Sequence, residues 1–289
     1  MITEFAAAKI NLALHVTGRR DDGYHLLDSA VMFAADAGDT LQLSAAGTTS
    51  LEITGPFSDG LETDASNLVL KAHAALADRF PDKVKPCAMT LTKALPVASG
   101  IGGGSADAAA ALRGLVRLNR LEISSGELAE IALKLGADVP VCLASKACRM
   151  RGIGEVIDSW NAPPVHAVLV NPLIGVSTAA IFRHLALTPD TRANAGIADR
   201  FADRLHLTQM LNWMSESRND LEGPAREIEP AISTVTQAMA STPKCGLVRM
   251  SGSGATCFGL FADEALAKAA AAELRARHAR WWVVPTRLV

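Results

Sequence analysis

The most informative stretch of this sequence reads Pro96-Val97-Ala98-Ser99-Gly100-Ile101-Gly102-Gly103-Gly104-Ser105-Ala106-Asp107. It lies between a predicted short strand, residues 89–93, and an alanine-rich segment that predicts a helix from about residue 105 to 118. Without Cβ atoms, such a loop can bring several backbone N–H groups onto one anion. The helix dipole adds about half a positive charge there. The stretch is therefore a candidate phosphate-binding loop, and an ordinary glycine-rich turn is the alternative.

Better-known phosphate motifs are excluded by inspection. No lysine and hydroxyl follow the glycines as a P-loop requires, and the glycine spacing does not satisfy GxGxxG at its third position. The HRD and DFG signatures of protein kinases are also absent from the sequence. The loop is therefore neither a P-loop nor a dinucleotide-binding loop of the Rossmann type.

The N-terminal part predicts a sheet followed by helices. Apolar residues alternate with polar or small ones over residues 10–16, which predicts a strand with one buried face and places Lys9 and Asn11 on the other. Residues 40–44 and 51–54 predict short strands, and residues 67–80 a helix. Another helix is expected to begin after Ser124 or Ser125 and to end at Gly136, with Asp138 just beyond.

The C-terminal part predicts a second unit of mixed structure. Strands are expected at residues 165–170, 246–250, 257–261 and 281–285, and helices before residue 239 and at 263–277. A second glycine-rich turn, residues 251–254, follows one of these strands. A change in texture at residues 160–164 predicts two domains, 1–160 and 161–289.

The glycine-rich stretch resembles the ATP-binding motif of the GHMP kinase superfamily, and further blocks agree with it in the same order along the chain. They are Ala8-Lys9-Ile10-Asn11-Leu12, Arg19-Arg20-Asp21-Asp22-Gly23-Tyr24-His25, Gly136-Ala137-Asp138-Val139-Pro140, Asn219-Asp220-Leu221-Glu222 and Arg249-Met250-Ser251-Gly252-Ser253-Gly254-Ala255. The resemblance implies an α+β, two-domain GHMP kinase fold. Its N-terminal domain would be ribosomal protein S5-like, its C-terminal domain ferredoxin-like, and its active site would lie in the cleft between them. Two departures stand out: Ile101 replaces the usual leucine, and Ala106 replaces a second serine.

The resemblance also implies cofactors and roles. ATP would be used with Mg²⁺, Asp138 would be the catalytic base, and Lys9 would pair with it and offset charge on the transferred phosphoryl group. The residues expected to bind ATP are Lys93, Pro96, Val97, Ala98, Ser99, Gly100, Ile101, Gly102, Gly103, Gly104, Ser105 and Ala106. Ser105 is also the candidate magnesium ligand.

The blocks near the N-terminus resemble those GHMP kinases whose acceptor carries a cytidine diphosphate group, in the non-mevalonate route to isoprenoids. Asn11, Tyr24 and His25 would surround the cytidine, joined by Thr178 and Phe182. A helix cap and a core ring are the alternatives for Thr178 and Phe182. A GHMP kinase of the homoserine or mevalonate type remains the alternative enzyme, and a nucleotide-binding sensor without turnover the alternative of another class.

Composition sets limits on partners and location. The 289 residues are 49% hydrophobic and 20% charged, with a net charge of −2. We therefore expect no electrostatic field of the whole molecule that would attract nucleic acid or an anionic membrane. The five cysteines form no CxxC pair, as in a reducing compartment. Glu4 and Lys9 interrupt the region where a secretory signal would lie. We expect a cytoplasmic monomer or homodimer that binds small molecules.

Overall fold

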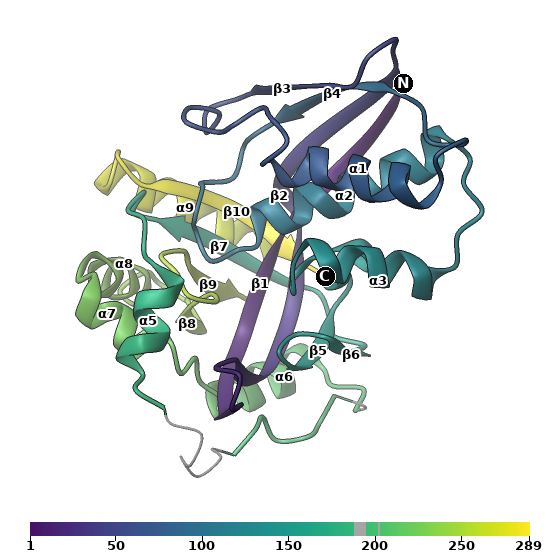
Figure 1. Ribbon diagram of the computed structural model, residues 1–289. Coiled ribbons are helices and arrows are strands. Elements are labelled where there is room, and N and C mark those ends of the chain that lie inside the picture. The colour runs from purple at the N-terminus through teal and green to yellow at the C-terminus, as the bar shows by residue number, and fades with distance from the viewer. Residues whose placement is uncertain (188–194, 202) are drawn as a thin grey trace. The chain divides into compact units, whose positions relative to one another are not determined.

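The computed structural model describes residues 1–187, 195–201 and 203–289. Its contacts divide the chain into two compact units (Figure 1). The first comprises residues 1–8, 38–97 and 102–145, and the second residues 9–37, 98–101 and 146–289. Strands β1 (Ile2–Arg19) and β2 (His25–Ala45) therefore contribute residues to both units, as does the glycine-rich loop. The predicted division at residue 160 stays a prediction.

The sheet of the first unit is built around β4 (Cys87–Thr92). This strand pairs antiparallel with the end of β2, from Thr40 opposite Thr92 to Ala45 opposite Cys87. On its other side β3 (Ser50–Thr54) pairs parallel to it. Residues of β4 that alternate along the strand are buried, as the period of a half-buried strand requires.

Helices α1 (Leu68–Arg79), α2 (Gly103–Leu118), α3 (Ser125–Leu135) and α4 (Val139–Ala144) complete the first unit. Figure 1 shows α1 beside α2, and the two are in contact. Alanines at 106 and 108–111 are buried, because small side chains let neighbouring helices approach α2 closely. The side chain of Asn67 caps α1 and that of Ser124 caps α3, while Gly136 ends α3. These caps confirm the predicted positions of the helix ends.

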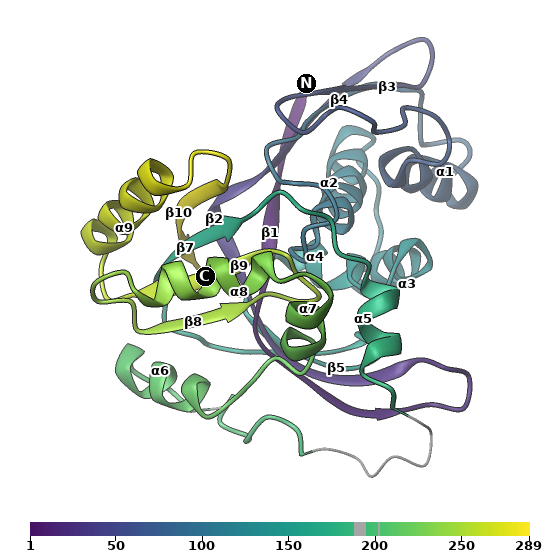
Figure 2. The same ribbon diagram turned by 90° about the vertical axis from the view of Figure 1, so that its left-hand side faces the viewer.

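The second unit contains a four-stranded antiparallel sheet in the order β10-β7-β9-β8. Its strands are β7 (Val165–Asn171), β8 (Leu247–Met250), β9 (Cys257–Phe261) and β10 (Trp282–Leu288). Helix α9 (Glu264–Arg277) packs on β7, β9 and β10 (Figure 2), and α8 (Ala231–Ala240) packs on β8 and β9. This strand order, with helices between β7 and β8 and between β9 and β10, is the ferredoxin-like arrangement that the resemblance implied.

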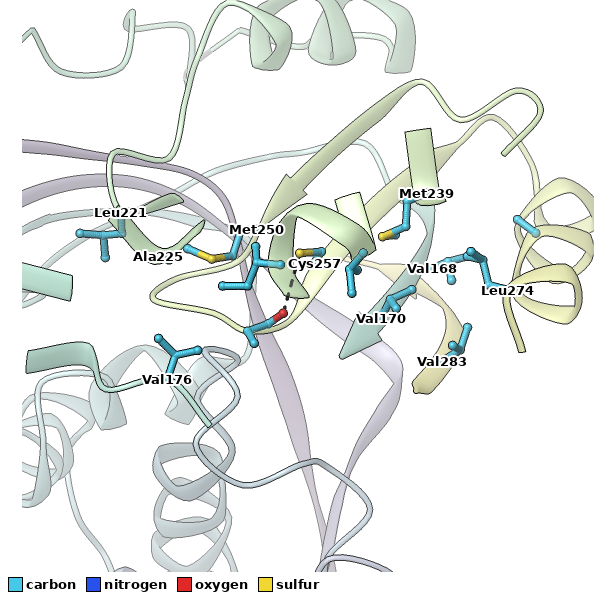
Figure 3. Close-up of a cluster of buried hydrophobic side chains, with 14 of the residues drawn as sticks. Val168, Val170, Val176, Leu221, Ala225, Met239, Met250, Cys257, Leu274 and Val283 are labelled. Carbon is cyan, nitrogen blue, oxygen red and sulfur yellow. Dashed lines mark hydrogen bonds between the residues drawn. The ribbon is translucent and has the colours of Figure 1, made fainter. Parts of the chain in front are cut away.

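A hydrophobic core lies beneath these helices. Figure 3 shows Val168 and Val170 of β7, Val283 of β10, Leu274 of α9 and Met239 of α8 in one cluster. Leu274 is 1% exposed, so its truncation to alanine is expected to cost about 2–5 kcal/mol.

The second unit also contains two further strands and three further helices among the described residues. Strand β5 (Cys148–Gly152) pairs with residues 27–31 of β2 and with β6 (Val156–Ser159). Helices α5 (Thr178–His184), α6 (Leu207–Ser215) and α7 (Glu222–Ile228) lie between β7 and α8 in sequence. Within the described ranges, no helix is both long and apolar enough to cross a membrane.

The first strand differs from its prediction. Strand β1 is longer than the predicted 10–16, and residues 9–16 are buried on both faces, so the prediction of one buried face is wrong. The polar side chains of Lys9, Asn11 and His15 are buried with the apolar ones. Within this unit, Ser29 Oγ accepts a hydrogen bond from the Asn11 side chain, and His15 Nδ1 lies 3.1 Å from the Ala195 carbonyl oxygen.

Candidate active site

The glycine-rich loop leads into α2 through residues with left-handed backbone. Gly100 has φ 74° and Gly102, the N-cap of α2, has φ 67°, a region that glycine adopts without steric cost. The helix begins at Gly103 rather than at about Ser105, because Gly103 and Gly104 already have helical backbone. Gly102 has no side chain to cap the helix, so the first N–H groups of α2 are suited to bind an anion.

Residues 99–101 interlock with the second glycine-rich turn inside the second unit. The Thr256 amide donates to the Ser99 carbonyl at 3.1 Å, and the Lys9 amide donates to the Ile101 carbonyl at 2.9 Å. A Cβ atom on Gly100 would lie only 2.5 Å from the Gly254 nitrogen. The two turns therefore fit together only because glycine stands at this position.

Asn11 is fixed by this same turn. Its backbone amide donates to Ser251 Oγ at 3.1 Å, and its side-chain Nδ2 donates to Ser29 Oγ at 2.7 Å. Asn219 Nδ2 in turn donates to the carbonyls of Met250 and Gly252, both at 2.8 Å. The Asn219 block found in the sequence thus supports the second turn.

The predicted base-binding residues come together in part. His25, the first residue of β2, stacks on Phe182 of α5, with ring centroids 4.5 Å apart and planes 26° apart. His25 Nε2 is buried and has no hydrogen-bond partner among the described residues. Burial, with the nearby charge of Arg19, lowers the pKa of His25. A neutral ring whose buried Nε2 makes no hydrogen bond within the described residues is suited to bind a polar group of a ligand.

Tyr24 directly precedes His25 in the sequence, and Thr178 belongs to the same helix as Phe182. Tyr24 is 60% exposed on the segment between β1 and β2. Thr178 begins α5, and its Oγ1 lies 2.7 Å from Ser253 Oγ of the second glycine-rich turn. Ser177 caps α5 through its own side chain, so the hydroxyl of Thr178 is not required for that cap.

The side chain of Lys93, which is predicted to bind ATP, contacts carboxylates of its own unit. It follows β4, is 4% exposed, and forms ion pairs with Asp39 and with Asp107, the latter at 2.6 Å. Burial raises the pKa of Asp107 to about 7, although the Lys93 ammonium opposes the shift. No sequence signal linked Asp39 with Asp107, because the partners come from three separate elements.

The predicted catalytic residues occupy defined positions, each in its own unit. Lys9 is buried within β1. Asp138 is the N-cap residue of α4, but its side chain makes no capping hydrogen bond to that helix. The backbone, rather than the carboxylate, therefore starts α4. The pairing of Lys9 with Asp138 stays a prediction.

Comparison with known proteins gives the class first. Residues 67–146 match the model of the GHMP kinases N terminal domain, and residues 202–280 match that of GHMP kinases C terminal. A solved homoserine kinase from Cytophaga hutchinsonii superimposes with a TM-score of 0.70 over 100% of this chain and 94% of that one, at 17% identity. The fold and the glycine-rich loop are those of a GHMP kinase.

The comparisons also give the particular family. A 4-diphosphocytidyl-2-C-methyl-D-erythritol kinase of Paramagnetospirillum magneticum is 50% identical, covering 98% of this chain and 97% of that protein. One of Cereibacter sphaeroides is 47% identical, covering 100% and 99%. A crystal structure of 4-(cytidine 5'-diphospho)-2C-methyl-D-erythritol kinase has a TM-score of 0.77 and 31% identity, covering 99% of both chains. The chain belongs to the 4-diphosphocytidyl-2-C-methyl-D-erythritol kinase family.

Proposed function

We propose that this protein transfers the γ-phosphoryl group of ATP to the 2-hydroxyl of 4-diphosphocytidyl-2-C-methyl-D-erythritol, a step of the non-mevalonate pathway to isoprenoids. The reaction class follows from the family. The choice of acceptor depends above all on the stacked pair of His25 and Phe182, with the His25 Nε2 buried and unpartnered in the described chain. Substrates of the homoserine and mevalonate type have no base to occupy such a position.

The glycine-rich loop would hold the ATP phosphates. Its support is the left-handed backbone at Gly100 and Gly102 and the N-terminus of α2 directly after them. Mg²⁺ would neutralise phosphate charge, with the Ser105 hydroxyl in the first turn of α2 as its protein ligand.

Asp138 would accept the proton of the acceptor hydroxyl, and Lys9 would offset charge on the phosphoryl group as it transfers. Since the transition state of phosphoryl transfer is loose, positioning and charge are expected to contribute as much as proton removal. Asn11, Tyr24, His25, Thr178 and Phe182 would bind the cytidine end. The tyrosine ring offers a stacking surface, and the asparagine and histidine offer polar atoms to the base.

A radiolabel transfer assay from γ-labelled ATP tests the proposal. We expect a labelled product with 4-diphosphocytidyl-2-C-methyl-D-erythritol and none with homoserine or mevalonate. Asp138→Asn should retain both ligands but reduce turnover by about a hundredfold to ten-thousandfold, the range for a lost general base. A variant that keeps more than about a third of wild-type turnover would remove Asp138 from the mechanism. If the wild-type protein binds ATP but forms no product with any acceptor, the alternative of a nucleotide-binding sensor without turnover would be favoured.

A further inference from the structure

Three charged side chains form a closed cluster in the first unit. Lys93, 4% exposed, donates hydrogen bonds from Nζ to Asp39 Oδ2 and to Asp107 Oδ2, the second at 2.6 Å. Asp39 belongs to β2 and is 0% exposed, and Asp107 belongs to α2 and is 4% exposed. Two of the three N–H donors of the Lys93 ammonium therefore bind carboxylates that are themselves buried.

This cluster contacts the chain on both sides of the glycine-rich loop. Before the loop, Asp39 Oδ1 accepts the backbone amides of Ala94 at 2.6 Å and Leu95 at 2.9 Å. After the loop, a Cβ atom on Gly103 would lie 3.6 Å from Lys93 Nζ and 3.7 Å from Asp39 Oδ2. The charged groups thus lie against the first residue of α2, where the loop ends.

We propose that Lys93 is a positioning residue of the glycine-rich loop: its ammonium links Asp39 to Asp107, holds both ends of the loop, and does not contact the ATP phosphates. This inference depends on the proposed function, in which the loop binds those phosphates. It replaces the direct contact that the sequence suggested for Lys93.

The two carboxylates depend on Lys93 to different degrees. Asp39 keeps two backbone amide donors whether or not the ammonium is present. Asp107 has Lys93 at Oδ2, while its Oδ1 is buried without a partner among the described residues. Removing the ammonium leaves a buried, uncompensated charge mainly at Asp107, and such charges are strongly destabilising. A neutral side chain of the same shape at position 107 should therefore relieve the damage.

The test uses Lys93→Met, in which the side chain keeps its length and loses its charge, alone and combined with Asp107→Asn. ATP affinity is measured by equilibrium titration, which does not require turnover, with thermal midpoints and acceptor affinity alongside. Lys93→Met alone should weaken ATP binding by about tenfold or more. The double variant should return to within about threefold of wild type, because the one carboxylate of the cluster that stays charged, Asp39, keeps its two backbone amide donors. Lys71→Met, at an exposed lysine of α1, is the matched control and should leave ATP affinity unchanged.

The deciding comparison is between the wild type and the double variant, since both are expected to fold and only one carries the ammonium. If Lys93 contacts phosphate directly, the double variant will bind ATP about tenfold or more weakly than wild type, and the inference is overturned. A double variant that does not fold overturns it as well, since neutralising Asp107 would then fail to restore the loop. Wild-type protein that binds no ATP would instead refute the proposed function.

Discussion

At the scale of single residues, His25 presents a buried ring nitrogen that has no hydrogen-bond partner in the part of the chain that the structure describes. Replacing it with alanine should remove the hydrogen bond to the base and leave a polar group of the bound base unpaired, at a cost of about 1–3 kcal/mol. We therefore expect KM for the cytidine acceptor to rise by roughly fivefold to 150-fold. ATP affinity should hardly change, because His25 lies in the proposed base site and not in the glycine-rich loop.

An acceptor carrying uracil in place of cytosine provides the matching control for His25→Ala. Uracil reverses the donor and acceptor pattern at one edge of the ring, so the wild type should use it poorly and His25→Ala should lose part of that discrimination. Equal use of both acceptors by the wild type would remove the cytidine assignment and favour another GHMP kinase activity.

Residue-level contacts show what the sequence could predict and what it could not. His25 and Phe182 were predicted to bind the base because each lies in a motif that can be recognised locally, and their rings do stack although the two residues are far apart in the sequence. Lys93 also lay beside a recognisable motif, but its partners Asp39 and Asp107 follow only from how β2, β4 and α2 pack. A buried ion pair between distant elements leaves no local pattern in the sequence.

At the scale of elements, the two glycine-rich turns depend on each other. Gly100→Ala would place a Cβ atom 2.5 Å from the Gly254 nitrogen and 2.6 Å from the Ser251 carbonyl oxygen, at a residue with φ 74°. Backbone strain of this kind costs about 1–3 kcal/mol, before any steric displacement of the second turn. We expect a lower thermal midpoint and weaker ATP binding, measured by calorimetry and titration.

Gly126→Ala is the matched control for Gly100→Ala. Gly126 lies in the first turn of α3, and a Cβ atom there would meet nothing within 4 Å. Alanine in a helix is favoured over glycine by up to about 1 kcal/mol, so this variant should be as stable as the wild type or more stable, with normal ATP binding. If both variants behave alike, the close fit of the two turns has no energetic importance.

Element types were predicted better than element limits. The cap at Ser124 and the stop at Gly136 were predicted from local chemistry, and the structure confirms both. The helix predicted over residues 67–80 is also present, with Asn67 as its N-cap residue. The start of α2 was placed two residues late because glycine is a poor helix former in isolation, yet Gly103 is helical here. Tertiary packing of the alanine face of α2 outweighs that local preference.

At the scale of the whole molecule, the ferredoxin-like strand order was predicted through the resemblance, since strand order joins segments far apart in sequence. The two contact units are not consecutive in sequence, because β1 and β2 each run through both. A sequence read from one end to the other gives no sign of a strand shared in this way. Composition and periodicity alone would have predicted only a mixed α and β chain.

Stability as a function of pH provides a prediction for the whole chain through His15. This histidine is buried, its Nε2 accepts the backbone amide of Arg218 at 3.2 Å, and its Nδ1 lies 3.1 Å from the Ala195 carbonyl oxygen. With Nδ1 protonated and Nε2 accepting, the neutral ring satisfies both contacts, whereas a second proton on Nε2 would face the Arg218 N–H. Burial, aided by the charge of Arg218, lowers the pKa of His15.

The direction of the effect follows from the lowered pKa of His15. As the pH falls below the ordinary histidine pKa of about 6.5, the unfolded chain binds a proton at His15 that the folded chain does not, so stability declines. Above that pH both states are neutral and His15 contributes no pH dependence. We expect the thermal midpoint of the wild type to fall between pH 7.5 and 5.5 by more than that of His15→Gln, whose side chain cannot titrate. Since His25 and other groups titrate in both proteins, the difference between the two curves isolates His15. Parallel curves would show that His15 accepts its proton as readily in the folded state as in the unfolded one, and that its contact with Arg218 yields without cost.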